Sequence, residues 1–420
     1  MKPKLLTTMR GYAPGMFFGD ALAGISVALV ALPLSIAIAI ASGAPPAAGL
    51  VTAVVAGFLI SALGGSRVQI GGPTGAFIVV VYSIIAQHGY DGLVLATLMA
   101  GVILLVAGLL RAGNLIAYVP EAVVNGFTIG IAIVIASSQL KDFAGIETAA
   151  LPADFLPKMA TLWAARESAD WPALAAGLAA LALIIVLRRL APRLPGLIVA
   201  VGAVSAAVAL MQLPVATIAS QFGDLPRGLP MPELPRVSVS RMTELLPSAF
   251  VIAFLAAVES LLSAMVADRM IGGSHRPNAE VLAQGWANIG SALFAGLPAT
   301  GAIARTATNV RAGGKTPVAG MIHALVILAV MLLAAPLAGY LAMPALAALL
   351  MMTAWNMSEP HKWKGYWATP REERLLLLLT LALTVLADLT VAIGVGVAFG
   401  LALRLRQGRS QAEEWHVPDR

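Results

Sequence analysis

The sequence predicts an all-α integral membrane protein that crosses the bilayer many times. Hydrophobic residues make up 59% of its 420 residues and charged residues only 11%, whereas an ordinary soluble domain carries roughly 25% charged residues. Apolar runs long enough to cross a hydrocarbon layer of about 30 Å recur from one end of the chain to the other. Too few polar residues remain to cover a soluble surface, so these observations exclude a soluble enzyme.

Fourteen apolar segments, separated by charged residues and by Gly/Pro breaks, are the predicted spans. The longest proline-rich stretch divides them into seven plus seven. The first seven are predicted at residues 20–42, 46–64, 68–87, 92–111, 119–140, 172–189 and 195–212. The second seven are predicted at residues 243–267, 279–295, 301–312, 317–338, 340–354, 372–387 and 390–408. We therefore expect one repeat over residues 20–212, an extracellular loop over 213–242 and a second repeat over 243–408.

The positive charges predict where the two ends of the chain lie. With fourteen spans, most Lys and Arg residues fall in loops on the same side as the termini, and few fall in the opposite loops. Cytoplasmic loops of membrane proteins carry this excess. Residues 1–19 and 409–420 are therefore predicted to be cytoplasmic, in a bacterial inner membrane. Residues 1–19 also lack the apolar core of a cleavable signal peptide.

Composition argues against a cofactor and against a nucleic-acid partner. The chain has no cysteine and only five scattered histidines, which offer no cluster of metal ligands. A net charge of +6 is accounted for by basic cytoplasmic loops. We expect no metal, no other cofactor and no nucleic acid, and we find no nucleophile with a base that would indicate a membrane-embedded enzyme.

Two spans carry Gly/Pro breaks at matching positions in the two halves. The third span contains residues 71–77, GGPTGAF, and residues 296–303, GLPATGAI, lead into the tenth. Each break includes a Thr-Gly-Ala triplet, which begins at Thr74 and at Thr300. Glycine and proline can serve only helix packing, but paired interruptions in corresponding spans indicate the central site of an inverted-repeat transporter.

The two helix starts that follow the breaks predict an anion site. Non-helical backbone at membrane depth is tolerated only where it is buried in protein or lines a cavity. Each restarting helix would point its free N–H groups and the positive end of its dipole into that space. The predicted anion-binding residues are Thr74, Gly75, Ala76 and Phe77 in the first half and Gly301, Ala302 and Ile303 in the second.

Glu259 is the carboxyl group predicted to lie deepest in the membrane. It stands in the middle of the eighth span, where a charged side chain costs a few kcal/mol and marks a functional residue by default. The offset that relates Thr74 to Thr300 relates Pro33, in the first span, to Glu259, so both belong to the predicted site. Burial disfavours the charged form of a carboxyl group, which suits Glu259 to carry a coupling proton; the alternative is a structural hydrogen bond to a neighbouring helix.

Arg305 follows the second break and leaves three interpretations open. Its guanidinium group could supply a fixed positive charge to the anion, or it could neutralise Glu259. It could also extend to the cytoplasmic surface, as long basic side chains do near the ends of spans.

Several stretches together resemble one family of membrane transporters. They are GISVALVALP at 24–33, GGPTGA at 71–76, VPEAVVNGF at 119–127, ESLLS at 259–263, NAE at 278–280 with QG at 284–285, RTA at 305–307 and GGKT at 313–316. The chain resembles the SulP anion transporters, the sulfate permease-like group called solute carrier family 26, over essentially its whole length. One departure from the family is that the cytoplasmic STAS domain usual after the last span is absent from residues 409–420.

The resemblance implies a 7+7 inverted repeat with a core domain of spans 1–4 and 8–11 and a gate domain of spans 5–7 and 12–14. The anion would lie between spans 1, 3, 8 and 10. An elevator-like movement of the core against the gate would give alternating access, and family members are commonly homodimers. The bilayer is the other expected partner.

The expected activity is proton-coupled symport of a dicarboxylate, bicarbonate or sulfate. A sodium-coupled bicarbonate branch of the family uses an acid and a hydroxyl in span 8, matched here by Glu259 and Ser263, and a threonine where this chain has Ile303. That departure favours H+ over Na+. The alternatives are an uncoupled anion channel or exchanger and a nucleobase permease of the same fold, which typically uses two acidic residues where this chain offers one.

Overall fold

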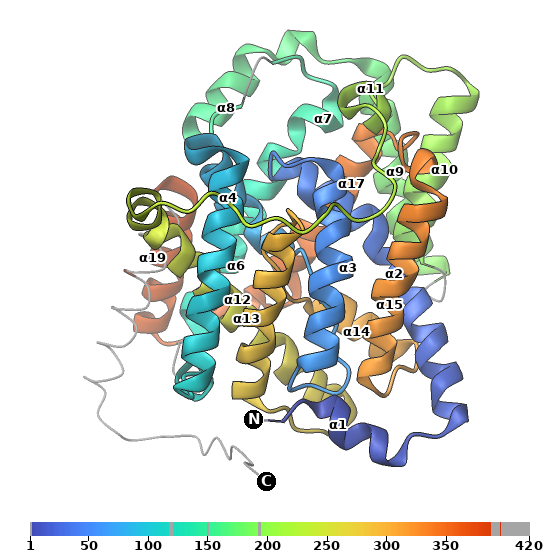
Figure 1. The fold of residues 1–420 in the computed structure, drawn as a ribbon. Coiled ribbons are helices and arrows are strands. Elements are labelled where there is room, and N and C mark those ends of the chain that lie inside the picture. The colour runs from blue at the N-terminus through green and yellow to red at the C-terminus, as the bar shows by residue number, and fades with distance from the viewer. Residues whose placement is uncertain (1, 117–120, 149–150, 192–194, 388–394, 396–420) are drawn as a thin grey trace.

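A computed structural model describes residues 2–116, 121–148, 151–191, 195–387 and 395, and Figure 1 shows them as a bundle of helices. The elements of the first half are α1 (Lys4–Thr8), η1 (Met9–Gly11), α2 (Pro14–Ala41), α3 (Pro46–Leu63), β1 (Gly71–Gly72), η2 (Gly75–Phe77), α4 (Ile78–Leu109), α5 (Gly113–Ile116), α6 (Glu121–Ser138), α7 (Leu140–Ala144), α8 (Phe155–Ala164), η3 (Arg166–Ser168), α9 (Trp171–Leu190) and α10 (Gly196–Leu210). Those of the second half are α11 (Ile218–Phe222), α12 (Val239–Ile271), α13 (Pro277–Leu293), β2 (Thr300–Gly301), α14 (Ile303–Arg311), α15 (Pro317–Leu333), α16 (Ala335–Ala338), α17 (Met343–Met357), η4 (Pro360–Lys362), α18 (Trp363–Ala368) and α19 (Arg371–Leu386).

Each of the first thirteen predicted spans contains a helix, and the fourteenth, residues 390–408, lies outside the described residues apart from Val395. The predicted tail 409–420 also lies outside them. Most of predicted spans 3 and 4 lies in the single helix α4. This helix is kinked at Gly89, with φ 71° and ψ 177°, a conformation that mainly glycine adopts. Proline in the first turn begins α2, α3, α9, α13, α15 and α17, where its missing N–H costs no helical hydrogen bond.

Six helical segments among the described residues are long and apolar enough to cross a membrane. They are Pro14–Ala41, Pro46–Leu63, Gly75–Leu109, Glu121–Ala144, Trp171–Leu190 and Val239–Ile271. Large apolar side chains on their outer faces, such as Leu22, Val106 and Leu178, are exposed, as expected for surfaces that contact lipid tails. The protein is a multi-pass integral membrane protein.

Two stretches contain more structure than the sequence indicates. The loop predicted at 213–242 includes α11, which is tied to the α16–α17 connection by a hydrogen bond from Ile218 N to Leu341 O, and α12 begins at Val239 rather than at residue 243. The predicted connection between spans 5 and 6 contains α7, α8 and η3. These short helices were missed because none of them is long enough to produce an apolar span.

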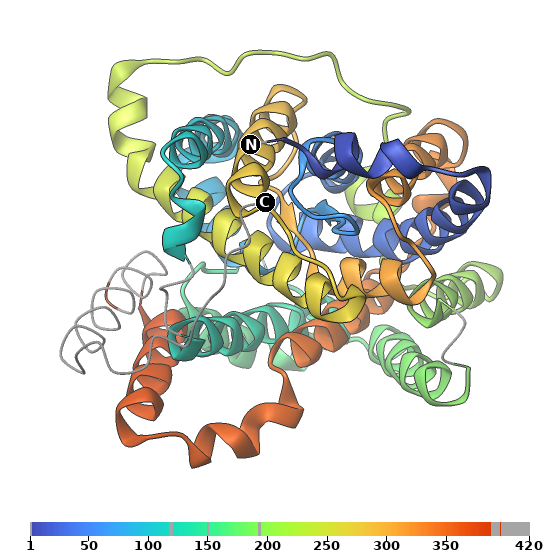
Figure 2. The same cartoon turned by 90° about the horizontal axis from the view of Figure 1, so that it is seen from below.

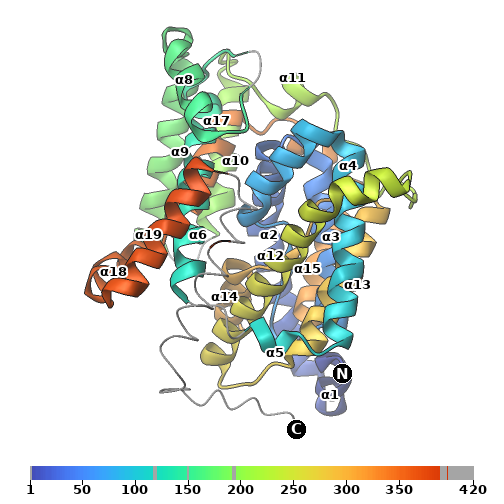
Figure 3. The ribbon, with the colours of Figure 1, turned by 90° about the vertical axis from the view of Figure 1, so that its left-hand side faces the viewer.

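The long helices form two groups. One, here called the core group, packs α2, α3, α4, α12, α13, α14 and α15 against one another; the other, the gate group, packs α6, α9, α10, α17 and α19. Figures 2 and 3 show the groups side by side, with α2, α10 and α17 among the helices that meet across the boundary. The grouping agrees with the core and gate domains that the family resemblance implies.

Candidate functional site

The two Gly/Pro breaks meet inside the core group. β1 and β2 pair antiparallel, with Gly71 opposite Gly301 and Gly72 opposite Thr300. Ala302 N also donates to Ile70 O at 2.9 Å. Helical structure restarts at Gly75 on one side of this ladder and at Ile303 on the other. The residues predicted from each break therefore converge on one place.

Neutral side chains of the core group hold the break in the tenth span. Asn288 on α13 bonds both polar groups of Ala299, each at 2.9 Å. Leu297 N donates to Thr52 Oγ1 on α3 at 2.6 Å, and Ser291 Oγ donates to Leu297 O at 2.6 Å. The non-helical backbone is thus satisfied within the protein, as membrane depth requires.

The break in the third span is held chiefly by one face of α14. Ile70 N donates to Thr306 Oγ1 at 3.1 Å, and Asn309 Nδ2 donates to Val68 O at 2.7 Å. Arg305 Nη2 donates to Pro73 O at 3.1 Å. Helix α14 therefore begins at one break and supplies the hydrogen-bonding partners of the other.

Glu259 lies beside the first helix start, in the layer predicted for it. Thr74 Oγ1 donates to Glu259 Oε2 at 2.9 Å, in a partly buried position. No ion pair to Glu259 is found among the described residues. Ser263, one turn further along α12, contacts Thr306 Oγ1 at 3.2 Å instead. Pro33 is buried within α2, two residues before Ser35.

The position of Arg305 contradicts two of its three interpretations. The side chain is 1% exposed, so it does not extend to the surface. It makes no ion pair with Glu259, and its guanidinium group contacts backbone carbonyls and the Ser35 hydroxyl at 3.0 Å instead. Both interpretations fail because the position of a residue within a predicted span does not tell which neighbours its side chain faces.

Ile303 and Ala304, in the first turn of α14, are exposed, unlike Arg305. Ile303 is 45% exposed and Ala304 is exposed, whereas Gly301 and Ala302 are buried. At the first helix start, Gly75, Ala76 and Phe77 are buried. A Cβ added at Gly75 would lie 3.0 Å from Met357 Sδ of the gate group. The first helix start therefore lies against the gate group. At the second helix start, the exposed side chain of Ile303 marks the side of α14 that other residues do not cover, here called the open side.

A buried polar stripe on α13 escaped the sequence analysis, which used two of its residues only as a family signature. Its members, four or three residues apart on one helical face, are Glu280, Gln284, Asn288 and Ser291, all 0% exposed. Glu280 accepts hydrogen bonds from Gly65 N at 2.8 Å and from Ser260 Oγ at 2.8 Å. The spacing is itself a signal, because polar residues at i, i+4, i+8 and i+11 share one side of a helix.

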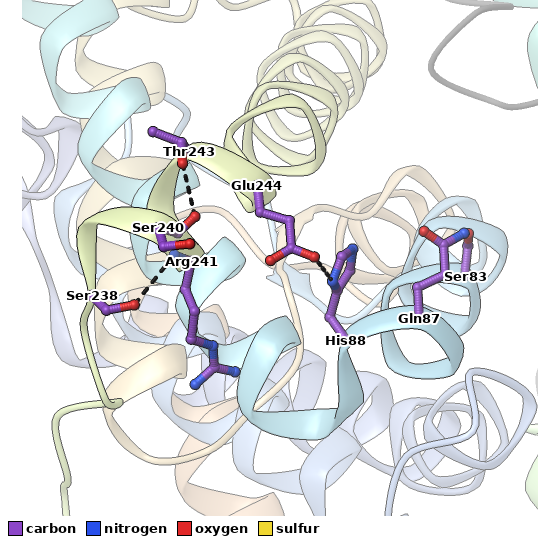
Figure 4. Close-up of polar contacts among 8 residues, drawn as sticks. All are labelled: Ser83, Gln87, His88, Ser238, Ser240, Arg241, Thr243 and Glu244. Carbon is purple, nitrogen blue, oxygen red and sulfur yellow. Dashed lines mark hydrogen bonds and ion pairs between the residues drawn. The ribbon is translucent and has the colours of Figure 1, made fainter.

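A separate contact joins α4 and α12 at a distance from the two breaks. His88, at the end of the first segment of α4, lies 3.3 Å from Glu244 on α12, between Nδ1 and Oε1, as Figure 4 shows. Ser238 Oγ accepts from Arg241 N at 3.2 Å and caps α12. This contact links two core helices away from the breaks.

No group of three or more potential metal ligands occurs in the part of the chain that the structure describes. The groups at the breaks are backbone N–H donors, hydroxyls, side-chain amides, the Arg305 guanidinium group and the carboxyl group of Glu259, a set that can bind an anion and hold a proton.

Comparisons with known proteins agree with this architecture. The sequence profile of the sulfate permease family matches residues 17–380. YvdB of Bacillus subtilis (strain 168) is 43% identical over 352 residues, which are 83% of this chain and 66% of YvdB. The chain thus spans about two thirds of the length of that relative.

Two solved structures share the fold. The transmembrane domain of the cyanobacterial bicarbonate transporter BicA superposes with a TM-score of 0.82 at 29% identity, over 91% of this chain and 99% of that domain. SLC26A9 superposes with a TM-score of 0.88 at 19% identity, over 97% of this chain and 68% of that one. With the profile match covering most of its length, the chain belongs to the sulfate permease family.

Proposed function

We propose that the protein is a secondary transporter of a small anion, bound between the two helix starts. The observation that carries this proposal is the pairing of Gly71–Gly72 with Thr300–Gly301. It brings the N-termini at Gly75 and Ile303 to one site, and helix N-termini attract anions through their free N–H groups and dipoles. Sulfate, bicarbonate and a dicarboxylate are the candidate substrates, since the matching family is described as sulfate permeases and BicA as a bicarbonate transporter.

The proposed contacts follow from the residues at the breaks. The proposed donors to the anion are the backbone N–H groups of residues 74–76, Gly301 and Ile303, because Ala302 N donates to Ile70 O and Phe77 N to Thr74 O. Ala302 and Phe77 would line the site, and the buried turn of α2 at Pro33 would form one wall of it. Ala302 and Ala304 offer no hydroxyl group, so the backbone has to provide the donors near α14. Recognition through N–H groups at fixed positions suits a compact oxyanion.

Glu259 is the proposed coupling group. A carboxylate this close to a bound anion repels it, whereas the protonated acid does not. Anion binding and proton uptake at Glu259 therefore favour each other, and the proposed carrier would take up the anion and the proton together. Ile303 supplies no oxygen ligand, which favours H+ over Na+ as the coupling ion, and no resident cofactor is required.

Alternating access is proposed to come from movement of the core group against the gate group, in an elevator-like shift. Both breaks and Glu259 belong to the core group, so the site would move as a unit. Helices α2, α10 and α17 are among those that meet across the boundary. We further propose a homodimer in a bacterial inner membrane with both termini in the cytoplasm.

Uptake into proteoliposomes tests the proposal. We would measure labelled sulfate, bicarbonate and succinate, each with and without an inward proton gradient, for the parent and for Glu259→Gln. The expected result is gradient-driven uptake of at least one anion by the parent, with the gradient dependence lost in the variant. Glu244→Gln, on the same helix but at the exposed outer end, is the matched control and should behave as the parent.

Two outcomes would contradict the proposal in different ways. Equal uptake by the parent and Glu259→Gln, indifferent to the gradient, would indicate an uncoupled channel or exchanger. No uptake of any anion, together with uptake of a labelled nucleobase, would indicate a nucleobase permease.

A further inference from the structure

The guanidinium group of Arg305 is directed into the protein rather than into the open side of the site. It is 1% exposed, while the two preceding residues, Ile303 and Ala304, are exposed. Thr306 and Asn309 are buried as well, and Asn309, four residues further along the helix, shares the face of Arg305. An anion approaching the open side of α14 would meet Ile303 and Ala304 before it reached Arg305.

The partners of Arg305 are backbone groups of the other break. Nη2 donates to Pro73 O at 3.1 Å and to Ser35 Oγ at 3.0 Å, and Nη1 lies 3.5 Å from Gly71 O. A Cβ placed on Gly72, between those two carbonyls, would overlap Nη1. The guanidinium group therefore occupies the space that a side chain at position 72 would need, and it binds the turn from both ends.

This turn leads directly into the first helix start. Pro73 precedes Thr74, whose hydroxyl group binds Glu259, and Gly75 begins η2. The carbonyl of Pro73 belongs to the same planar peptide unit as the N–H of Thr74. Holding that carbonyl in place consequently fixes the direction of the Thr74 N–H and the position from which Thr74 reaches Glu259.

We propose that Arg305 is a positioning residue: its fork of donors fixes the Gly71–Pro73 turn, and thereby the first helix start and the Thr74–Glu259 contact, without touching the anion itself. The inference deepens the proposed function and rests on it for its effect on transport. Arginine suits this role because its planar group presents several donors in fixed directions, whereas lysine offers a single point charge.

The experiment separates hydrogen-bond geometry from charge. Arg305→Lys keeps the charge without the fork, Arg305→Met removes both, and Ser35→Ala keeps the charge but removes one acceptor. We would measure KM and maximal rate for anion uptake, and hydrogen exchange of amides in residues 68–77 with residues 121–138 as an internal reference. Arg188→Lys, at an exposed arginine on α9 that contacts Asn356, is the matched control.

Positioning predicts that Arg305→Lys resembles Arg305→Met. KM should rise about tenfold in both, the loss expected for one charge-assisted hydrogen bond, and it should rise less in Ser35→Ala. The maximal rate of uptake should change less than KM. Amide hydrogen exchange should become faster in residues 68–77 but not in the reference residues 121–138. A parent-like KM and parent-like exchange in Arg305→Lys, with loss only in Arg305→Met, would show that charge alone matters and would overturn the proposal.

The exchange measurement also separates failure of this inference from failure of the proposed function. If the parent transports no anion but Arg305→Lys still accelerates exchange in residues 68–77, the positioning role stands and the transport proposal falls. If the parent transports and exchange in those residues stays unchanged in all Arg305 variants, the positioning role falls alone.

Discussion

The two Gly/Pro breaks look alike in sequence but are held in different ways. The break in the tenth span is fixed by neutral partners, with Asn288 bonding Ala299 twice and Thr52 binding Leu297. The break in the third span depends on Arg305 and carries the contact from Thr74 to Glu259. The first arrangement is suited to rigidity, and the second places a charge and a titratable group beside one helix start. Changes at the two breaks should therefore affect different properties.

The largest effect on stability is expected at Asn288, in the neutral break. Asn288→Leu would leave the N–H and the carbonyl of Ala299 without partners in a fully buried position. Each unsatisfied group costs about 1–3 kcal/mol, so we expect destabilisation of about 3 kcal/mol and a lower midpoint of thermal unfolding in detergent. Asn356→Leu, at an exposed asparagine, is the control; equal midpoints for the two variants would contradict the rigid role of this break.

A smaller effect, on transport rather than stability, is expected at Thr74 in the other break. Thr74→Val removes the hydroxyl group that binds Glu259 while keeping the shape of the side chain. Because the donated hydrogen bond, worth about 1 kcal/mol, favours the charged form of Glu259, which repels the anion, its loss should lower KM for the anion about fivefold and leave the unfolding midpoint nearly unchanged. The control is Thr128→Val, because the Thr128 hydroxyl group bonds only within α6; this variant should change neither KM nor the midpoint. A parent-like KM in Thr74→Val would show that the contact from Thr74 to Glu259 does not affect anion binding.

Ile303 tests whether an added ligand changes the coupling ion. Because the side chain is 45% exposed, Ile303→Thr should cost less than about 1 kcal/mol of stability. We expect uptake by this variant to respond to an inward Na+ gradient to which the parent is indifferent. The control is Ile133→Thr, a comparably exposed residue on α6. Sodium-dependent uptake by the parent would contradict the preference for H+.

The smallest effect is expected at the outer pair His88 and Glu244, away from both breaks. The Glu244 side chain is 59% exposed, and exposed ion pairs contribute about 0–1 kcal/mol. Glu244→Gln should therefore shift the unfolding midpoint very little and leave the KM for the anion unchanged. A large change in KM would extend the functional region from the breaks to the outer surface.

Much of the site could be predicted because its signals are local. The Gly/Pro breaks at 71–77 and 296–303 interrupt apolar runs, and Glu259 stands out in an apolar span, so both are visible without any contact information. The stripe from Glu280 to Ser291 was equally visible as a spacing, but a polar face on a helix does not reveal its partner. The direction of Arg305 could not be predicted, because rotation of a helix about its axis depends on its neighbours.

The sequence by itself determined the membrane class, the position of most of the long helices, the two breaks and the place of Glu259 within an apolar helix. Hydropathy and backbone preference act over a few residues, so these features need no tertiary contacts. The tertiary structure alone decided that Gly71–Gly72 pairs with Thr300–Gly301 and that Arg305 binds the Pro73 carbonyl. These contacts join residues more than two hundred positions apart. Only packing of the whole core group can choose among the many donors and acceptors that a broken span leaves open.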